Sequence, residues 1–290
     1  MTVVGAHGAP LRGIEDCRIV IDGTVTEPRL DHPECVVVGP DGALWCGGER
    51  GQIYRIERDG SAMAEVATTG GFCLGMAFGP DGMLYVCDLA HAAVMRVDTA
   101  TGTVETFTTG TPERRIRIPN YPVFDAQGRL YVSDSHAPDE PGPGIYRFGL
   151  DGEGELWFSE PLTFANGMAL APGGDALYVA ETFAKRVSRI PIDAHGRPGP
   201  RDTVAVVDAL PDGLALDADG RIYVACYEPS EILRIDPGGA VRLLVVDPTA
   251  HTLCHPTNVA LADGTLYAAN LGRWHITALD LTNQEGDPVV

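Results

Sequence analysis

Short apolar runs, each followed by a turn and a second run with an aromatic residue, recur along the chain at a nearly constant interval. They read ECVVVGPDGALWCGG, LGMAFGPDGMLYVCD, NYPVFDAQGRLYVSD, NGMALAPGGDALYVAE, DGLALDADGRIYVAC and NVALADGTLYAAN. Their first residues lie one step of 40 and four steps of 46 residues apart, and they are Glu34, Leu74, Asn120, Asn166, Asp212 and Asn258. A repeat of this length predicts six copies of one supersecondary unit.

Each copy continues with a third strand-like run, as in QIYRI, AVMRV, GIYRF, RVSRI, EILRI and the looser HITAL. Four of these are followed by another turn and a fourth short run, such as VETF at 104–107 or ELWF at 155–158. Four strands joined by turns rich in Gly and Asp describe a propeller blade. A β-sandwich or a solenoid also has short alternating strands, but repeats of about 46 residues favour blades. The sequence therefore predicts an all-β fold, a six-bladed β-propeller with four antiparallel strands per blade.

The two ends of the chain suggest how the ring closes. The last repeat has no obvious fourth strand, whereas CRIVIDG at 17–23 precedes the first repeat and belongs to no blade. We expect this N-terminal strand to become the outer strand of the sixth blade, which protects an otherwise open sheet edge. Residues 1–290 are then expected to form a single β-propeller domain.

The composition of the chain limits the binding partners that can be expected. The formal charge of −19 repels nucleic-acid backbones and anionic membranes, so neither is expected as a partner. No targeting or membrane-spanning segment is recognisable, which favours a cytoplasmic protein. Seven scattered cysteines without CxxC pairs indicate neither a disulfide framework nor a zinc motif. We expect a monomer or homodimer that acts on a small-molecule substrate.

The first residues of the six repeats occupy equivalent positions at one mouth of the predicted channel. Five of the six, all except Leu74, carry side-chain oxygens. A turn preference explains Asn or Asp at a strand start, but it does not explain Glu34. Two carboxylates with amide oxygens around one axis suit a hard divalent cation, Ca²⁺ first, with Mg²⁺, Mn²⁺ and Zn²⁺ as alternatives.

These segments resemble the family of senescence marker protein, gluconolactonase and luciferin-regenerating enzyme, over nearly the whole chain. The segments PDGLALDADGRIYVACY, FANGMALAPGGDALYVAET and HPECVVVGPDGALW are similar to the family's metal-binding motifs. The resemblance implies a calcium-dependent lactone hydrolase on a six-bladed propeller, with Asp212, Asn166 and Glu34 as metal ligands. The segment IPNYPVFDAQGRLYVSDS resembles the one whose asparagine touches substrate or metal, here Asn120.

The chain departs from the family pattern near Asn120. Tyr121 stands where an aspartate is frequent, and Ile118 stands at the position of a frequent arginine, with Arg117 one place before it. Other runs, such as VAET at 179–182, also look like strictosidine-synthase-like propellers, which condense amines with aldehydes without a metal. That reading is the alternative, because those enzymes lack the full Glu, Asn and Asp set. A second alternative is a propeller without catalysis that binds a ligand and keeps the metal for rigidity.

For hydrolysis the expected general base is Asp212, with His136 in the loop SDSHAPDEPGPG as the other candidate. Asn120, Tyr121, Arg117 and Asn258 are expected to bind the substrate, with Arg117 steering anionic groups.

Three aromatic residues occupy matching positions after the second strand of their blades or in the following turn. They are Phe183, Tyr227 and Trp274. Their role is open between lining an apolar pocket and packing between blades.

Overall fold

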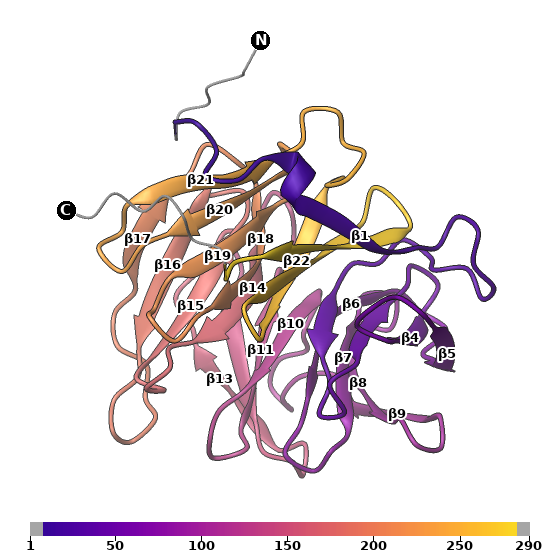
Figure 1. Ribbon diagram of the computed structural model, residues 1–290. Coiled ribbons are helices and arrows are strands. Elements are labelled where there is room, and N and C mark those ends of the chain that lie inside the picture. The colour runs from indigo at the N-terminus through magenta and orange to yellow at the C-terminus, as the bar shows by residue number, and fades with distance from the viewer. Residues whose placement is uncertain (1–7, 283–290) are drawn as a thin grey trace.

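The computed structural model describes residues 8–282, which form six four-stranded sheets arranged around a common axis (Figure 1). All paired strands are antiparallel, and the helix found in the described range is a short 3-10 turn, Ile14–Asp16. The predicted six-bladed, all-β propeller is therefore confirmed.

Every blade is built in the same order from the axis outward. The innermost strands are β2 (Val36–Val38), β6 (Cys73–Phe78), β10 (Pro119–Phe124), β14 (Ala165–Leu170), β18 (Pro211–Leu216) and β22 (Pro256–Ala262). The second strands are β3 (Leu44–Gly47), β7 (Leu84–Asp88), β11 (Leu130–Asp134), β15 (Ala176–Glu181), β19 (Ile222–Cys226) and β23 (Thr265–Asn270). The third strands are β4 (Gln52–Ile56), β8 (Ala93–Asp98), β12 (Gly144–Phe148), β16 (Arg186–Pro191), β20 (Glu231–Ile235) and β24 (His275–Asp280). The outer strands are β5 (Met63–Thr68), β9 (Thr103–Thr108), β13 (Gly154–Phe158), β17 (Asp202–Val206), β21 (Val241–Val246) and β1 (Cys17–Asp22).

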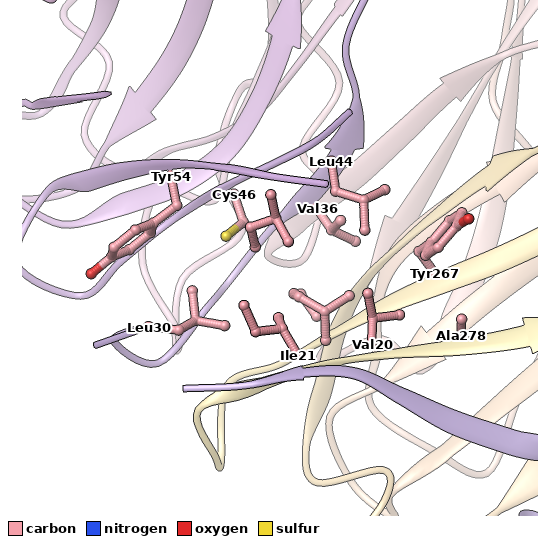
Figure 2. Packing of buried hydrophobic residues seen from close by; sticks show 12 residues of the cluster. Val20, Ile21, Leu30, Val36, Leu44, Cys46, Tyr54, Tyr267 and Ala278 are labelled. Carbon is pink, nitrogen blue, oxygen red and sulfur yellow. The ribbon is translucent and has the colours of Figure 1, made fainter. Parts of the chain in front are cut away.

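The ring closes through both its inner and its outer strands. Each innermost strand contacts the innermost strands of the two neighbouring blades, including β2 against β22. The strand β1 pairs with β24 from Cys17 opposite Leu279 to Asp22 opposite His275, which confirms the predicted N-terminal closure of the sixth blade. Figure 2 shows Val20 and Ile21 of β1 in one buried cluster with Val36, Leu44 and other apolar side chains of the first blade. Burial of these side chains joins the first and last blades.

The repeated turn before each second strand has a specific structural basis. Its glycine adopts a positive φ, for example 78° at Gly42 and 80° at Gly220, which other residues tolerate poorly. In the first, second and fifth blades an aspartate of this turn accepts a hydrogen bond from the aromatic residue of the following strand: Asp41 from Trp45 at 3.2 Å, Asp81 from Tyr85 at 2.9 Å and Asp217 from Tyr223 at 3.1 Å. This pairing explains why the Asp, the Gly and the aromatic residue recur together.

Within the described range, no helix is long and apolar enough to span a bilayer.

Candidate metal and substrate site

A small cavity of about 10 Å³ lies among the innermost strands, at the end where they begin. A volume of about this size holds one water or one monatomic ion. It is lined by Glu34, Cys35, Gly75, Asn120, Tyr121, Asn166, Asp212, Thr257 and Asn258. All five oxygen-bearing residues of the repeat therefore meet at one place, although they are far apart along the chain.

β-bulges aim these side chains at the axis. Pro119 pairs with Asp134 and Pro122 with Val132, so that β10 carries one residue more than β11 over this stretch. The same irregularity follows Ala165 in β14 and Pro211 in β18. A bulge bends its strand and redirects a side chain out of the regular alternation. It falls where Asn120, Asn166 and Asp212 lie.

Glycines after two of these residues let neighbouring strands approach closely. A Cβ added to Gly167 would lie 2.5 Å from the Cα of Gly213, and one added to Gly213 would lie 2.6 Å from the Cα of Asn258. Both distances are shorter than atoms in contact allow. The inner strands of the fourth, fifth and sixth blades can therefore converge only because these positions lack a side chain.

Two hydroxyl groups fix how the asparagines present their amides. The Ser135 hydroxyl donates to the carbonyl of Ala165 at 2.7 Å, and the Thr182 hydroxyl donates to that of Pro211 at 2.8 Å. Each hydroxyl has one hydrogen, so each must accept from the asparagine beside it. The Nδ2 of Asn120 donates to Ser135 at 3.0 Å, and that of Asn166 donates to Thr182 at 3.2 Å. This arrangement leaves the carbonyl oxygens Oδ1 available to a ligand of the cavity, which both asparagines line.

The side-chain amide of Asn258 has different hydrogen-bond partners. Its Oδ1 accepts from the backbone N–H of Val36 at 3.1 Å, and its Nδ2 donates to the Tyr121 hydroxyl at 3.1 Å. Tyr121 thus crosses the channel from the third blade to the sixth. It also borders a larger apolar space of about 470 Å³ along the rest of the channel, so its ring separates the two cavities.

The two carboxylates of the cavity are strongly destabilised in their charged form. Burial and the charge of Glu34 raise the pKa of Asp212 well above its usual value, and a hydrogen bond from Asn166 offsets this only in part. Burial likewise raises the pKa of Glu34, against a smaller opposing effect of a hydrogen bond with Thr257. Neither carboxylate has an ion pair with a basic side chain within residues 8–282. Two like charges in a dry site require a compensating cation or a bound proton.

The donor chemistry of the cavity fits a hard divalent cation. The Oε2 of Glu34 is buried and has no hydrogen-bond partner in the described part of the chain. Carboxylate and amide oxygens are the ligands that Ca²⁺ and Mg²⁺ prefer. Cys35 also borders the cavity, but burial raises the pKa of its thiol, which disfavours the thiolate that a softer metal would need.

Two predicted site residues do not line this cavity. The Nε2 of His136 lies 3.0 Å from the Nη1 of Arg117, and both side chains are within 4 Å of the Glu140 carboxylate, at 3.7 and 3.8 Å. They form a polar group beside Ser135, in which His136 and Glu140 come from the loop after β11 and Arg117 from the segment before β10. Their catalytic and substrate-binding roles stay predictions.

The sequence did not reveal the orienting hydroxyls. Ser135 and Thr182 each follow the acidic residue that ends a second strand, in the runs SDS and AET. That shared position was a usable signal. The Thr257 hydroxyl donates to the Glu34 backbone carbonyl at 2.7 Å. No sequence signal marks Thr257, because this contact joins the last repeat to the first.

A second acidic group lies beside the first blade. Ligand atoms of Asp31, His32 and Glu49 lie within 4.8 Å of one another. The Asp31 carboxylate already accepts from the Arg50 Nε at 2.8 Å and from the Gln52 amide at 3.0 Å. Its charge is therefore compensated by the chain itself.

Comparisons with known proteins agree with this architecture. A gluconolactonase of Zymomonas mobilis is 26% identical over 57% of this chain and 51% of its own length. The chain thus spans about half the length of the first curated relatives that it matches. The protein STRICTOSIDINE SYNTHASE-LIKE 6 of Arabidopsis thaliana is 25% identical and aligns with 87% of this chain and 80% of its own.

A solved structure of regucalcin, a calcium-binding protein from Agrobacterium tumefaciens, superposes with a TM-score of 0.71 at 19% identity, over 87% of this chain and 90% of that chain. The model of the SMP-30/gluconolactonase/LRE-like region matches residues 32–270, which include every residue of the cavity. The chain belongs to the SMP-30/gluconolactonase/LRE-like family.

Proposed function

We propose that this protein hydrolyses a small-molecule lactone or a related ester and depends on a divalent cation of the Ca²⁺ type. One observation carries the proposal, namely that two buried carboxylates and two oriented amides line a cavity of ionic size without a cationic partner. The gluconolactonase among its relatives and the calcium-binding regucalcin among its structural neighbours support it.

The residues that would hold the cation are Glu34, Asn166 and Asp212, with the Oδ1 of Asn120 beside them. When bound, the cation would act as a Lewis acid on the carbonyl oxygen of the ester. Asn258 is not assigned as a ligand, because its Oδ1 already accepts from the Val36 backbone and its Nδ2 donates to Tyr121.

Asp212 is the proposed general base. Its carboxylate lines the cavity that would hold the cation, which places it beside a water bound there. It would take a proton from the attacking water at the edge of the cavity.

Asn120 and Tyr121 are proposed to orient the substrate. The Tyr121 hydroxyl accepts from Asn258, so its own hydrogen can be donated to a substrate oxygen. Arg117 and His136 would contribute only from the rim, where they bond to one another.

The test is a panel of lactones assayed with added calcium, with a chelator, and with the Asp212→Asn variant. We expect hydrolysis that a chelator abolishes and calcium restores, and a loss of kcat of about 100-fold or more in the variant. Calcium that binds without hydrolysis of any lactone would indicate a binding propeller instead.

A condensing propeller is the second candidate, favoured by the extent of the match to the Arabidopsis relative. It predicts a reaction between an amine and an aldehyde that persists in the chelator. Hydrolysis that needs calcium excludes it as the main activity.

A further inference from the structure

Six equivalent backbone hydrogen bonds define a rim around the mouth of the polar cavity. In each blade the N–H of a residue just after the second strand donates to the carbonyl of a residue just before the first strand. The pairs, donor first, are Glu49 with Asp31, Leu89 with Phe72, Ser135 with Ile118, Thr182 with Phe164, Tyr227 with Leu210, and Leu271 with His255, at 2.9 to 3.2 Å. These residues adjoin the starts of the inner strands, and the polar cavity lies at that end of the strands.

The rim is chemically uneven. The first blade contributes Asp31 and Glu49, and the third carries the Arg117 and His136 group next to Ser135. The fourth and fifth blades contribute an apolar segment instead. This aromatic arc consists of Phe164, Phe183, Leu210, Tyr227 and the adjoining His255 of the sixth blade.

Two side chains of the aromatic arc are exposed to solvent, and its rings form two contacting pairs. Phe183 and Tyr227 are 45% and 37% exposed, among the few large apolar side chains with that exposure in the described structure. The ring centroids of Phe164 and Phe183 lie 4.8 Å apart, and those of Tyr227 and His255 lie 4.7 Å apart. Clustered exposed apolar surface beside a polar cavity indicates a place where a ligand is bound.

The arc adjoins the proposed metal ligands. Phe183 directly follows Thr182, whose hydroxyl holds the Asn166 amide. Burial raises the pKa of the Tyr227 phenol most, and after Glu228 the charges of Glu34 and Asp212 raise it further, so the phenol lies within electrostatic reach of both carboxylates. A substrate whose ester carbonyl reached the edge of the cavity would place its substituent on this arc.

We propose that the substrate carries an apolar substituent, alkyl or aryl, that packs on Phe164, Phe183 and Tyr227, rather than the several hydroxyl groups of a sugar lactone. Hydroxyl groups against these rings would lose water without gaining partners, whereas methylene groups would gain from burial. This inference rests on the proposed hydrolysis and specifies its substrate class.

The experiment uses γ-lactones that carry no side chain or an alkyl chain of two, four or six carbons, alongside gluconolactone. We expect kcat/KM to rise by up to about fourfold per methylene until the arc is covered. In Phe183→Ser we expect kcat/KM to rise by less than about twofold per methylene. In the wild type the increase in kcat/KM with chain length should come mainly from a lower KM. Val206→Ser, at a 69% exposed position on the outer strand β17, is the matched control and keeps the wild-type trend.

Calorimetry with the corresponding γ-lactams, which resist hydrolysis, separates the two proposals. Lactam affinity that rises with chain length, and rises less in Phe183→Ser, supports the aromatic arc as the binding surface. This holds even if no lactone is hydrolysed, a result that would reject the proposed hydrolase activity. Hydrolysis with a flat chain-length profile, or with gluconolactone preferred, overturns the inference and leaves the hydrolase standing. Tyr227→Ser provides a second variant should Phe183→Ser fold poorly, with the same expectations.

Discussion

The protein buries carboxylates in two contrasting ways. Glu181 at the end of β15 is fully buried, and it accepts hydrogen bonds from Arg186 at 2.8 Å, from Ser188 at 2.6 Å and from the backbone of Thr163 at 3.0 Å. These partners, with the nearby charge of Arg201, hold the pKa of Glu181 below its usual value despite burial. Glu34 and Asp212 are similarly buried, but burial raises the pKa of each, and the charge of Glu34 raises that of Asp212 further.

The two sites differ in the source of the positive charge that compensates the buried carboxylate. Around Glu181 the chain supplies two arginines, so the carboxylate is part of the fold. At the axis it supplies only neutral amides and hydroxyls, so the compensating charge must come from solution. Each prediction below tests this contrast, in order of decreasing effect.

Glu181→Gln is expected to lower the free energy of unfolding by about 3–5 kcal/mol, because it leaves Arg186 and Arg201 near a neutral amide in a buried site. Chemical denaturation followed by circular dichroism measures it. Calcium affinity of the folded variant should remain that of the wild type. The exposed Glu160→Gln serves as control, with a change below about 0.5 kcal/mol.

Calcium should stabilise the protein more as the pH rises. The raised pKa values mean that the cation-free folded state binds more protons than the unfolded state from about pH 4 up to the raised pKa values, about 8 for Glu34, so its stability falls with increasing pH over this range. Calcium needs the deprotonated carboxylates, so a calcium concentration fixed at 100 times the Kd of pH 8 should add about 2.7 kcal/mol at pH 8 and much less at pH 5.

Thermal unfolding with and without calcium at both pH values measures this effect. Asp212→Asn should abolish the calcium effect and stabilise the cation-free protein, because it removes one of two repelling charges. An equal calcium effect at both pH values would contradict the assignment of these carboxylates as ligands.

Thr182→Val should weaken calcium binding by about 10- to 100-fold, since Asn166 loses the acceptor that orients its amide. Isothermal calorimetry measures the affinity. Thr203→Val on the exposed edge of β17 is the control and should bind calcium as the wild type does. Unchanged binding in Thr182→Val would mean that the hydroxyl does not position the ligand.

Asp31→Asn should change calcium affinity by less than about twofold, because Arg50 and Gln52 already neutralise that group. The same calorimetric titration measures it. A tenfold loss would place the cation at the outer acidic group of Asp31, His32 and Glu49 instead of at the axis.

The architecture was readable from the sequence because it rests on local, repeated signals. The period of 46 residues, the alternation of apolar positions and the paired turn aspartate and aromatic residue are each written within one blade. The unpaired run at 17–23 likewise had one available edge, which β1 occupies. Equivalent positions of a repeat must meet around the axis, so the convergence of Glu34, Asn120, Asn166, Asp212 and Asn258 followed from the fold.

What each of these residues can do was decided only by tertiary contacts. Asn120 and Asn258 hold equivalent places, yet Ser135 frees the carbonyl oxygen of one while Val36 occupies that of the other. The position of His136 outside the cavity wall depends in the same way on Arg117 and Glu140. The sequence repeat determines the position of a residue in its blade, because all blades share one backbone geometry. Hydrogen-bond partners and charge compensation determine its chemistry, and they come from residues that only folding brings within 3 or 4 Å.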